Sequence, residues 1–122
     1  MFEARERRYL ETAPLGRLAT ADGDGRPHVV PVCFALVGDR LATPIDEKPK
    51  RAEPSALRRV RDVRENPRVA LVVDHYAASW DRLGWVQVRG TAELVDAGGP
   101  CHAAAVRALR RKYDQYAAHA LE

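Results

Sequence analysis

The chain has 122 residues and is 46% hydrophobic, which suits a single domain that buries a substantial core. Its formal net charge is +3, and no apolar run approaches the ~20 residues that a membrane-spanning helix needs. Residues 1–10 mix acids and bases and lack the apolar centre of a signal peptide, and two cysteines cannot build a disulfide framework. We therefore expect a cytoplasmic protein, neither membrane-bound nor a secreted disulfide-rich domain.

The first half of the chain predicts a helix followed by a β-hairpin and a short strand. Residues 2–13 carry a partial apolar face at helical spacing. Two glycines within residues 22–25 supply the positive φ angles of a tight hairpin turn. Pro27 and Pro31 cannot donate a ladder hydrogen bond, so the strand that holds them is expected to be an edge, bulged or turned toward a ligand. We expect the strands of this half at residues 16–21, 27–37 and 41–46.

The second half predicts helix, strand, strand and helix. Ser55 occupies the N-cap position of a helix over residues 56–64, which the sequence Asn66-Pro67 ends. Residues 68–74 are continuously apolar and predict a strand buried on both faces. The remaining elements are a long strand or hairpin arm and a C-terminal helix, at residues 84–95 and 101–119. Strands joined by short turns, with helices at the periphery, favour a mainly β protein built as an antiparallel barrel.

A run of basic residues is the first candidate site. Seven cations lie within residues 48–64, interleaved with acids. One interpretation is a solvated helix face with salt bridges, as charge runs usually are. The other is a clamp for a phosphate, because Arg58 and Arg59 fall in the first turns of a helix, where free N–H groups and the dipole favour an anion. The cations are Lys48, Lys50, Arg51, Arg58, Arg59, Arg61 and Arg64.

The aromatic residues and His75 leave alternatives open. Tyr76, Trp80 and Trp85 cluster around residues 74–84, where they either pack the loop against the barrel or form a rim that stacks on a ring. His75 is the best-placed titratable histidine for proton transfer, although a lone histidine is more often a surface or capping residue. The nucleophile and phosphate motifs GxSxG, Walker A, GxGxxG and HExxH do not occur, and no metal site is expected. The catalytic residues stay unknown.

An ordered series of segments carries a family resemblance. LATADGDGRPHVVPVCFAL, a short strand, KPKR, LRRVRDVRENPRVALVVDHY and WVQVRGTAEL follow one another over roughly residues 8–96. The series resembles the pyridoxamine 5′-phosphate oxidase-like flavin and deazaflavin oxidoreductases, whose fold is the FMN-binding split β-barrel. More narrowly, it is similar to their actinobacterial, coenzyme F420-dependent branch. Family members usually continue into a final strand, so residues 1–122 are expected to be one split-barrel domain without it.

The resemblance implies a homodimer with two cofactor sites at its interface, and it assigns candidate residues. Two wall segments line the cofactor ring, basic residues bind its phosphate, and Trp85 comes from the partner subunit. The ring wall consists of Val30, Pro31, Val32, Cys33, Phe34, Thr43, Pro44 and Ile45. The phosphate ligands are Lys50, Arg51, Arg58, Arg59 and Arg61.

The resemblance also implies the activity, which is hydride transfer between coenzyme F420 and a small organic substrate. FMN is the alternative cofactor, because both molecules present a tricyclic ring and a phosphate to the same arginines. A non-catalytic protein that binds a flavin, a deazaflavin or haem is the alternative function. Nucleic-acid binding is not expected, because acids interleave the arginine helix and no aromatic stacking platform accompanies it.

Overall fold

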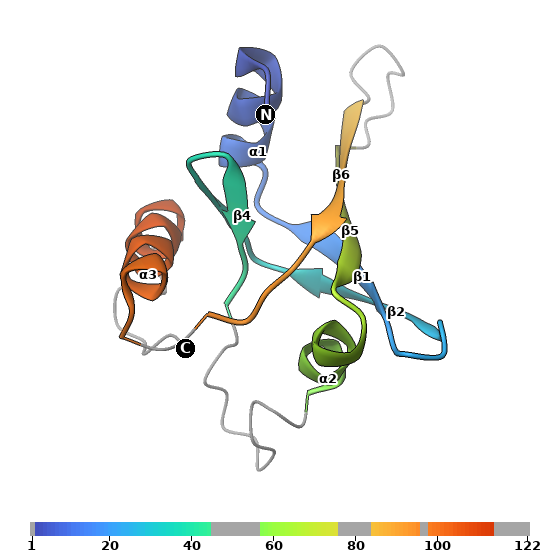
Figure 1. The fold of residues 1–122 in the computed structure, drawn as a ribbon. Helices are drawn as coiled ribbons and strands as arrows, with labels where there is room; N and C mark the ends of the chain where they lie inside the picture. Colours follow the sequence, from blue (N-terminus) through green and yellow to red (C-terminus); the bar gives the residue numbers. More distant parts are fainter. Residues whose placement is uncertain (1, 45–56, 76–83, 96–97, 114–122) are drawn as a thin grey trace.

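The computed structural model describes residues 2–44, 57–75, 84–95 and 98–113. These segments form helices and antiparallel strands in the order expected from the sequence (Figure 1). The helices are α1 (Ala4–Thr12), α2 (Arg58–Glu65) and α3 (Pro100–Lys112). The strands are β1 (Gly16–Ala21), β2 (Pro27–Val32), β3 (Ala35–Val37), β4 (Arg40–Ala42), β5 (Arg68–His75) and β6 (Gly84–Thr91).

The main sheet has the strand order β2-β1-β5-β6, and β3 and β4 form a separate hairpin. Gly16 pairs with Val32 and Ala21 pairs with Pro27, so the β1–β2 hairpin closes through the glycine-containing turn. Gly25 in this turn has a φ of 82°, a conformation that side chains rarely adopt. Among the described strands, β2 is an edge of the sheet. No neighbouring strand lies on its outer side, so the missing N–H groups of the two prolines break no ladder hydrogen bond there. Of the three alternatives that the prolines left open for this strand, the described strands show the edge position.

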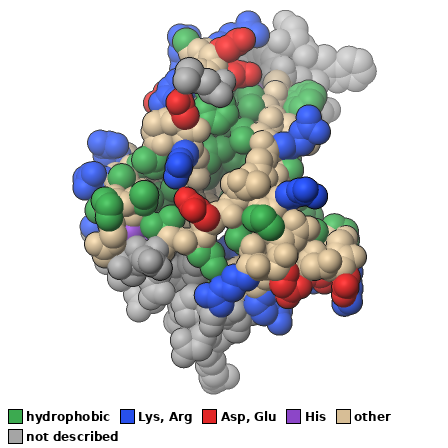
Figure 2. All heavy atoms as spheres, viewed as in Figure 1, with side chains coloured by type: hydrophobic (Ala, Val, Ile, Leu, Met, Phe, Trp, Pro, Cys, Tyr) green, Lys and Arg blue, Asp and Glu red, His purple; other side chains and the backbone are tan. Residues whose placement is uncertain are grey.

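The mainly β architecture is confirmed, but the described strands do not close into a barrel. Closure requires the outer strands of the sheet to be hydrogen-bonded to one another or to an intervening strand. Within the described residues, β2 and β6 are sheet edges and the β3–β4 hairpin is a sheet of its own. Figure 2 shows hydrophobic side chains in the hollow between α1 and β6. The sheet is therefore open where the sequence predicted a barrel.

The strand expected at residues 27–37 is interrupted after Val32, and β3 begins at Ala35. The cause is Tyr113, whose hydroxyl accepts from the backbone N–H of Phe34 at 3.2 Å and lies 3.1 Å from its carbonyl oxygen. Because the polar backbone groups of Phe34 bond to a side chain, they do not extend the ladder. The strand expected at 41–46 is correspondingly short, since β4 ends at Ala42.

Other element boundaries also differ from the prediction. Helix α2 begins at Arg58 with Leu57 as its N-cap, later than expected, and Ser55 lies outside the described residues. Its predicted end is confirmed, because Asn66 is the C-cap. Strand β6 ends at Thr91 and helix α3 at Lys112, and residues 114–122 lie outside the described part.

Strand β5 is not buried on both faces, as its apolar run had suggested. Leu71 and Val73 are buried, Ala70 and Val72 are half-buried, and Asp74 is exposed. This alternation is that of a sheet with one face toward the core and the other uncovered by any described element. The apolar run therefore belongs to a strand that is buried on one face only, and sequence periodicity alone does not distinguish such a strand from one buried on both faces.

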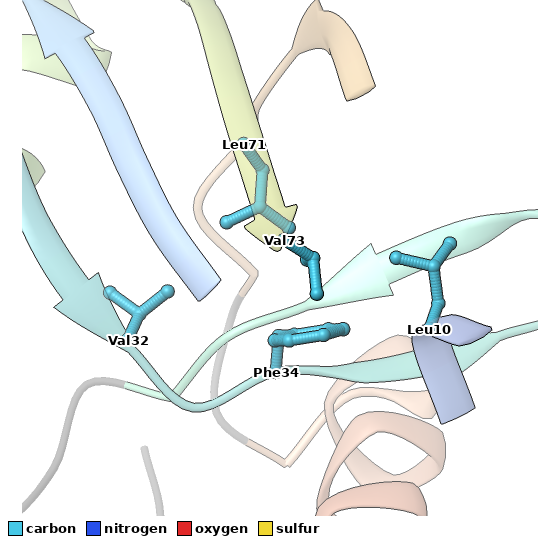
Figure 3. Packing of buried hydrophobic residues seen from close by; sticks show 5 residues of the cluster. All are labelled: Leu10, Val32, Phe34, Leu71 and Val73. Atoms are coloured by element: carbon cyan, nitrogen blue, oxygen red, sulfur yellow. The ribbon is translucent and has the colours of Figure 1, made fainter. Parts of the chain in front are cut away.

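The main core lies between the sheet, α1 and the β3–β4 hairpin. Leu10, Val32, Leu71 and Val73 lie around the ring of Phe34 (Figure 3). Gly16 makes this packing possible, since a Cβ there would meet the Leu71 side chain at 3.0 Å and the Phe34 ring at 3.3 Å. A second cluster, with Leu109 and Tyr113, packs α3 against β3. Of the helices that the structure describes, none has the length and apolar character to cross a membrane.

Candidate functional site

The two predicted ring-wall segments lie side by side in the structure. The hydroxyl of Thr43, just after β4, donates to the carbonyl oxygen of Cys33, just after β2, at 2.8 Å. Cys33 is half-buried and Thr43 is exposed. The residues between β2 and β3 thus contact the end of β4. Ile45, the last residue of the predicted wall, lies outside the described residues.

The alternating geometry of β2 determines which wall side chains could touch a ligand. Val32 and Phe34 are buried in the core and Val30 packs against it, whereas Pro31 is exposed. A ligand at the wall could therefore meet the exposed side chain of Pro31. Phe34 is closed off, because its side chain is buried and its backbone N–H and carbonyl bond to Tyr113. The half-buried side chain of Cys33 packs against the cluster that holds α3. Sequence alone does not show this division, because it depends on which face of β2 meets the core.

Arg59 connects the wall to helix α2. One of its guanidinium N–H groups donates to the carbonyl oxygen of Pro44 at 3.3 Å. In the described part of the chain, no carboxylate forms an ion pair with Arg59. A half-buried guanidinium that bonds only to a carbonyl retains N–H groups for an anion. Cys33, Thr43, Pro44 and Arg59, all predicted site residues, thus meet in one place.

Arg58, predicted for the same role, is engaged differently. Its Nε donates to both oxygens of Asp62, at 3.0 and 3.2 Å, and its Nη2 donates to the carbonyl oxygen of Arg26 at 3.3 Å. Asp62 is 1% exposed and also accepts from the hydroxyl of Thr20 at 2.7 Å. The charge of Arg58 is therefore paired with the buried carboxylate of Asp62.

The electrostatics of Asp62 follow from these contacts. Burial acts to raise the pKa of its carboxyl group. The hydrogen bonds from Thr20 and Arg58 act in the opposite direction, as do the positive charges of Arg58 and His28, and together they hold the pKa of Asp62 below its ordinary value. Asp62 is therefore ionised at neutral pH. Sequence reasoning missed the roles of Thr20 and Asp62, although the i,i+4 spacing of Arg58 and Asp62 is the signal of such a pair.

The remaining predicted residues do not all join this arrangement. Arg61 is exposed on α2, and it forms no hydrogen bond or ion pair with another side chain of the described residues. Lys50 and Arg51 lie outside the described residues, as do Tyr76 and Trp80. His75 is exposed at the end of β5.

Trp85 lies on the opposite, uncovered face of the main sheet. It is 69% exposed and pairs in register with Asp74, which binds Arg17 through an ion pair of 2.6 Å. Val29, on the other edge strand, is 63% exposed. Between these edges, small side chains and two arginines line a shallow depression of about 760 Å³. Its lining comprises Ala19, Thr20, Ala21, Arg68, Val69, Ala70, Arg89, Gly90 and Thr91.

These features define a small mainly β protein with a basic helix beside an open strand end. The chain belongs to the pyridoxamine 5′-phosphate oxidase family, whose sequence profile matches residues 2–121. The resemblance expected from the ordered segments is thereby confirmed at the level of the family.

The chain is similar to several particular proteins. The chain is 34% identical over 99 residues to a 5a,11a-dehydrotetracycline/5a,11a-dehydrooxytetracycline reductase of Streptomyces rimosus, covering 80% of this chain and 67% of the relative. Among solved structures, a FAD-binding protein from Mesorhizobium loti is 30% identical, with a TM-score of 0.63 over 98% of this chain and 81% of that one. A structure described as an F420 reductase is 27% identical, with a TM-score of 0.64 over 93% of this chain and 79% of that one.

A more distant structure matches in fold alone. HutZ, a haem storage protein from Vibrio cholerae, has a TM-score of 0.73 over 95% of this chain and 81% of its own, at 16% identity. The two proteins therefore share a fold, and HutZ is described as a haem storage protein.

Proposed function

We propose that this protein is a coenzyme F420-dependent oxidoreductase, which transfers a hydride between the deazaflavin and a small organic substrate. The observation that carries the proposal is Arg59, a half-buried cation with no carboxylate partner in the described residues, held at the carbonyl of Pro44 beside the strand end. The reductase of S. rimosus and the F420 reductase support the activity. FMN is the alternative cofactor, which the FAD-binding protein of M. loti supports as a flavin.

The residues present fit a ligand that combines a flat ring with a phosphate. Pro31 and Thr43 offer exposed side chains at the wall, the half-buried Cys33 also packs against the cluster that holds α3, and Arg59 offers a forked cation. Arg61, Lys50 and Arg51 remain candidates for the same anionic group. When bound, the ring of the cofactor supplies the hydride, and the chain orients it and tunes its electrostatics.

The proposal includes a homodimer in which Trp85 of one protomer completes the site of the other. The uncovered face of the main sheet supports this arrangement, because Trp85 and Val29 are large apolar residues exposed on its two edge strands. We also propose that the two described sheets are parts of one split barrel in a single domain, and that the protein acts in the cytoplasm.

Equilibrium dialysis of the purified protein against F420 and against FMN tests the function. We expect saturable binding of F420, with weaker binding of FMN, followed by substrate-dependent oxidation of reduced F420. Preferential FMN binding would move the assignment to the alternative cofactor. Stoichiometric binding without turnover would favour a non-catalytic carrier, and binding of neither cofactor would exclude the proposed enzyme.

A further inference from the structure

Two buried polar side chains lie where α2 meets the β1–β2 hairpin. Among the described residues, Thr20 and Asp62 are the polar or charged side chains that are fully buried, at 4% and 1% exposure. A buried carboxylate is costly unless it is paired and hydrogen-bonded. Both oxygens of Asp62 are satisfied, one by the Nε of Arg58 at 3.0 Å and the other by the hydroxyl of Thr20 at 2.7 Å.

These contacts extend from β1 through α2 to the hairpin turn. Arg58 continues them by donating to the carbonyl of Arg26, and Glu65 accepts from the backbone N–H of Gly23 at 2.8 Å. Positions 58, 62 and 65 are spaced i, i+4 and i+7, so they lie on one face of α2. The hairpin therefore fixes both the place and the rotation of the helix.

The rotation of α2 decides where Arg59 points. The residue after Arg58 is turned by about 100° around the helix axis, away from the face that meets the hairpin. There its guanidinium reaches the carbonyl of Pro44 at 3.3 Å. A forked cation recognises a phosphate only in a narrow range of positions, of the order of 0.5 Å for a well-built site. Any contact that holds α2 in this rotation thus acts on anion recognition.

We propose that Thr20, Asp62 and Arg58 are positioning residues for the anion-binding site. Arg58 is not itself an anion ligand, because its guanidinium is paired with Asp62. The hydrogen bonds among Thr20, Asp62 and Arg58 hold α2 in the orientation in which Arg59 meets the anion beside Pro44. The inference rests on the proposed function, since it assumes that Arg59 binds the phosphate of the cofactor. It divides the arginines of one helix into a positioning residue and a ligand.

The test compares ligands that differ in their phosphate. FMN and riboflavin form one pair, which differ by the phosphate alone, and F420 and its deazaflavin core with a free ribityl chain form the other, which differ by the phosphate and the tail joined to it. Thr20→Val removes the hydroxyl at nearly constant shape, and Thr20→Ser is the matched control that keeps it. For whichever pair binds, we expect the wild-type preference for the phosphate-bearing ligand to fall about 5-fold in Thr20→Val, by loss of one buried hydrogen bond, and to be retained in Thr20→Ser.

Combining variants distinguishes positioning from direct binding. Arg59→Ala should lower the same preference, and Thr20→Val should add little to it in the double variant, because both changes act through one guanidinium. Thr20→Val and Arg58→Ala should likewise be non-additive. Independent, additive losses in that pair would make Arg58 a ligand in its own right and overturn the proposal.

Two further outcomes separate the inference from the function on which it rests. If the wild type prefers the phosphate-bearing ligand and Thr20→Val keeps the full preference, or weakens both members of a pair equally, the positioning role is wrong and the proposed function stands. If the wild type binds none of the four ligands, the proposed function fails and the inference fails with it. Thermal unfolding of each variant shows whether it is folded during the measurement.

Discussion

Arg58 and Arg59 are neighbours of the same type, yet the structure gives them different tasks. Arg58 is bonded to buried Asp62, whereas Arg59 bonds to a carbonyl oxygen and pairs with no carboxylate in the described segments. The difference follows from helix geometry, because consecutive residues point in directions about 100° apart. Only one of the two can face the hairpin, and the other is left to face the strand end.

Removal of the Arg59 side chain should therefore weaken cofactor binding. We expect Arg59→Ala to cost about 1.5–3 kcal/mol of binding free energy, the range of a hydrogen bond to a charged group. Equilibrium dialysis with F420 and FMN measures the change. Arg64→Ala, at an exposed position of the same helix, is the matched control and should leave the affinity within about twofold. An affinity of Arg59→Ala equal to that of the control would place the anion elsewhere.

At the scale of elements, Tyr113 links the end of α3 to the interruption between β2 and β3. Its hydroxyl is 3.2 Å from the backbone nitrogen of Phe34 and 3.0 Å from the carbonyl oxygen of Pro14. Tyr113→Phe should lower the free energy of unfolding by about 1–3 kcal/mol, because it leaves the buried N–H of Phe34 without its partner. Urea denaturation measures the loss. Tyr9→Phe is the control, since its hydroxyl bonds to Gly84 in a less buried place, and it should lose less.

Lys112, at the end of α3, makes the stability of the protein depend on pH. Its Nζ lies 3.6 Å from the centre of the Phe34 ring and donates to the carbonyl oxygen of Leu10 at 2.9 Å. Burial lowers the pKa of Lys112 from 10.5 to about 8. Between these two values the unfolded chain binds more protons than the folded one, so the contribution of Lys112 to stability rises as the pH increases.

Lys112→Met removes this titration while keeping an apolar side chain of similar length. Relative to the variant, the wild type should gain stability as the pH is raised from about 8 to about 10, and the difference should be constant below about 7. Urea denaturation at a series of pH values measures it. A difference between the two proteins that does not change across this range would contradict the lowered pKa.

The order of elements was predictable because each one carries its own local signal. Hydrophobic periodicity and the turn residues indicated the helices and strands, and Asn66-Pro67 correctly ended α2. The interruption after Val32 was not predictable, because it depends on Tyr113, 79 residues away from Phe34 in the chain. Likewise, the ordered segments indicated the family, but the split between Arg58 and Arg59 needed the position of the hairpin. Local signals define elements, and their mutual placement defines the site.

At the scale of the molecule, the main sheet is covered on one face only by described elements. The core, with Leu71 and Val73, faces α1 and the β3–β4 hairpin, and Trp85, which pairs with Asp74, lies on the other face. An isologous dimer would bring the same face of a second copy against it. In such a dimer each site would combine Arg59 of one protomer with Trp85 of the other, so that two defective protomers could complement each other.

Mixing Arg59→Ala with Trp85→Ala protomers tests this shared site. Each variant alone should bind cofactor weakly. After unfolding and refolding together, random association makes about half of the dimers mixed, and each mixed dimer holds one intact site of two, so about one quarter of all sites should regain wild-type affinity. The control mixes Arg59→Ala with the double variant, which can assemble no intact site. Binding in the test mixture no higher than in this control, or a monomer in sedimentation, would exclude a site built from both protomers.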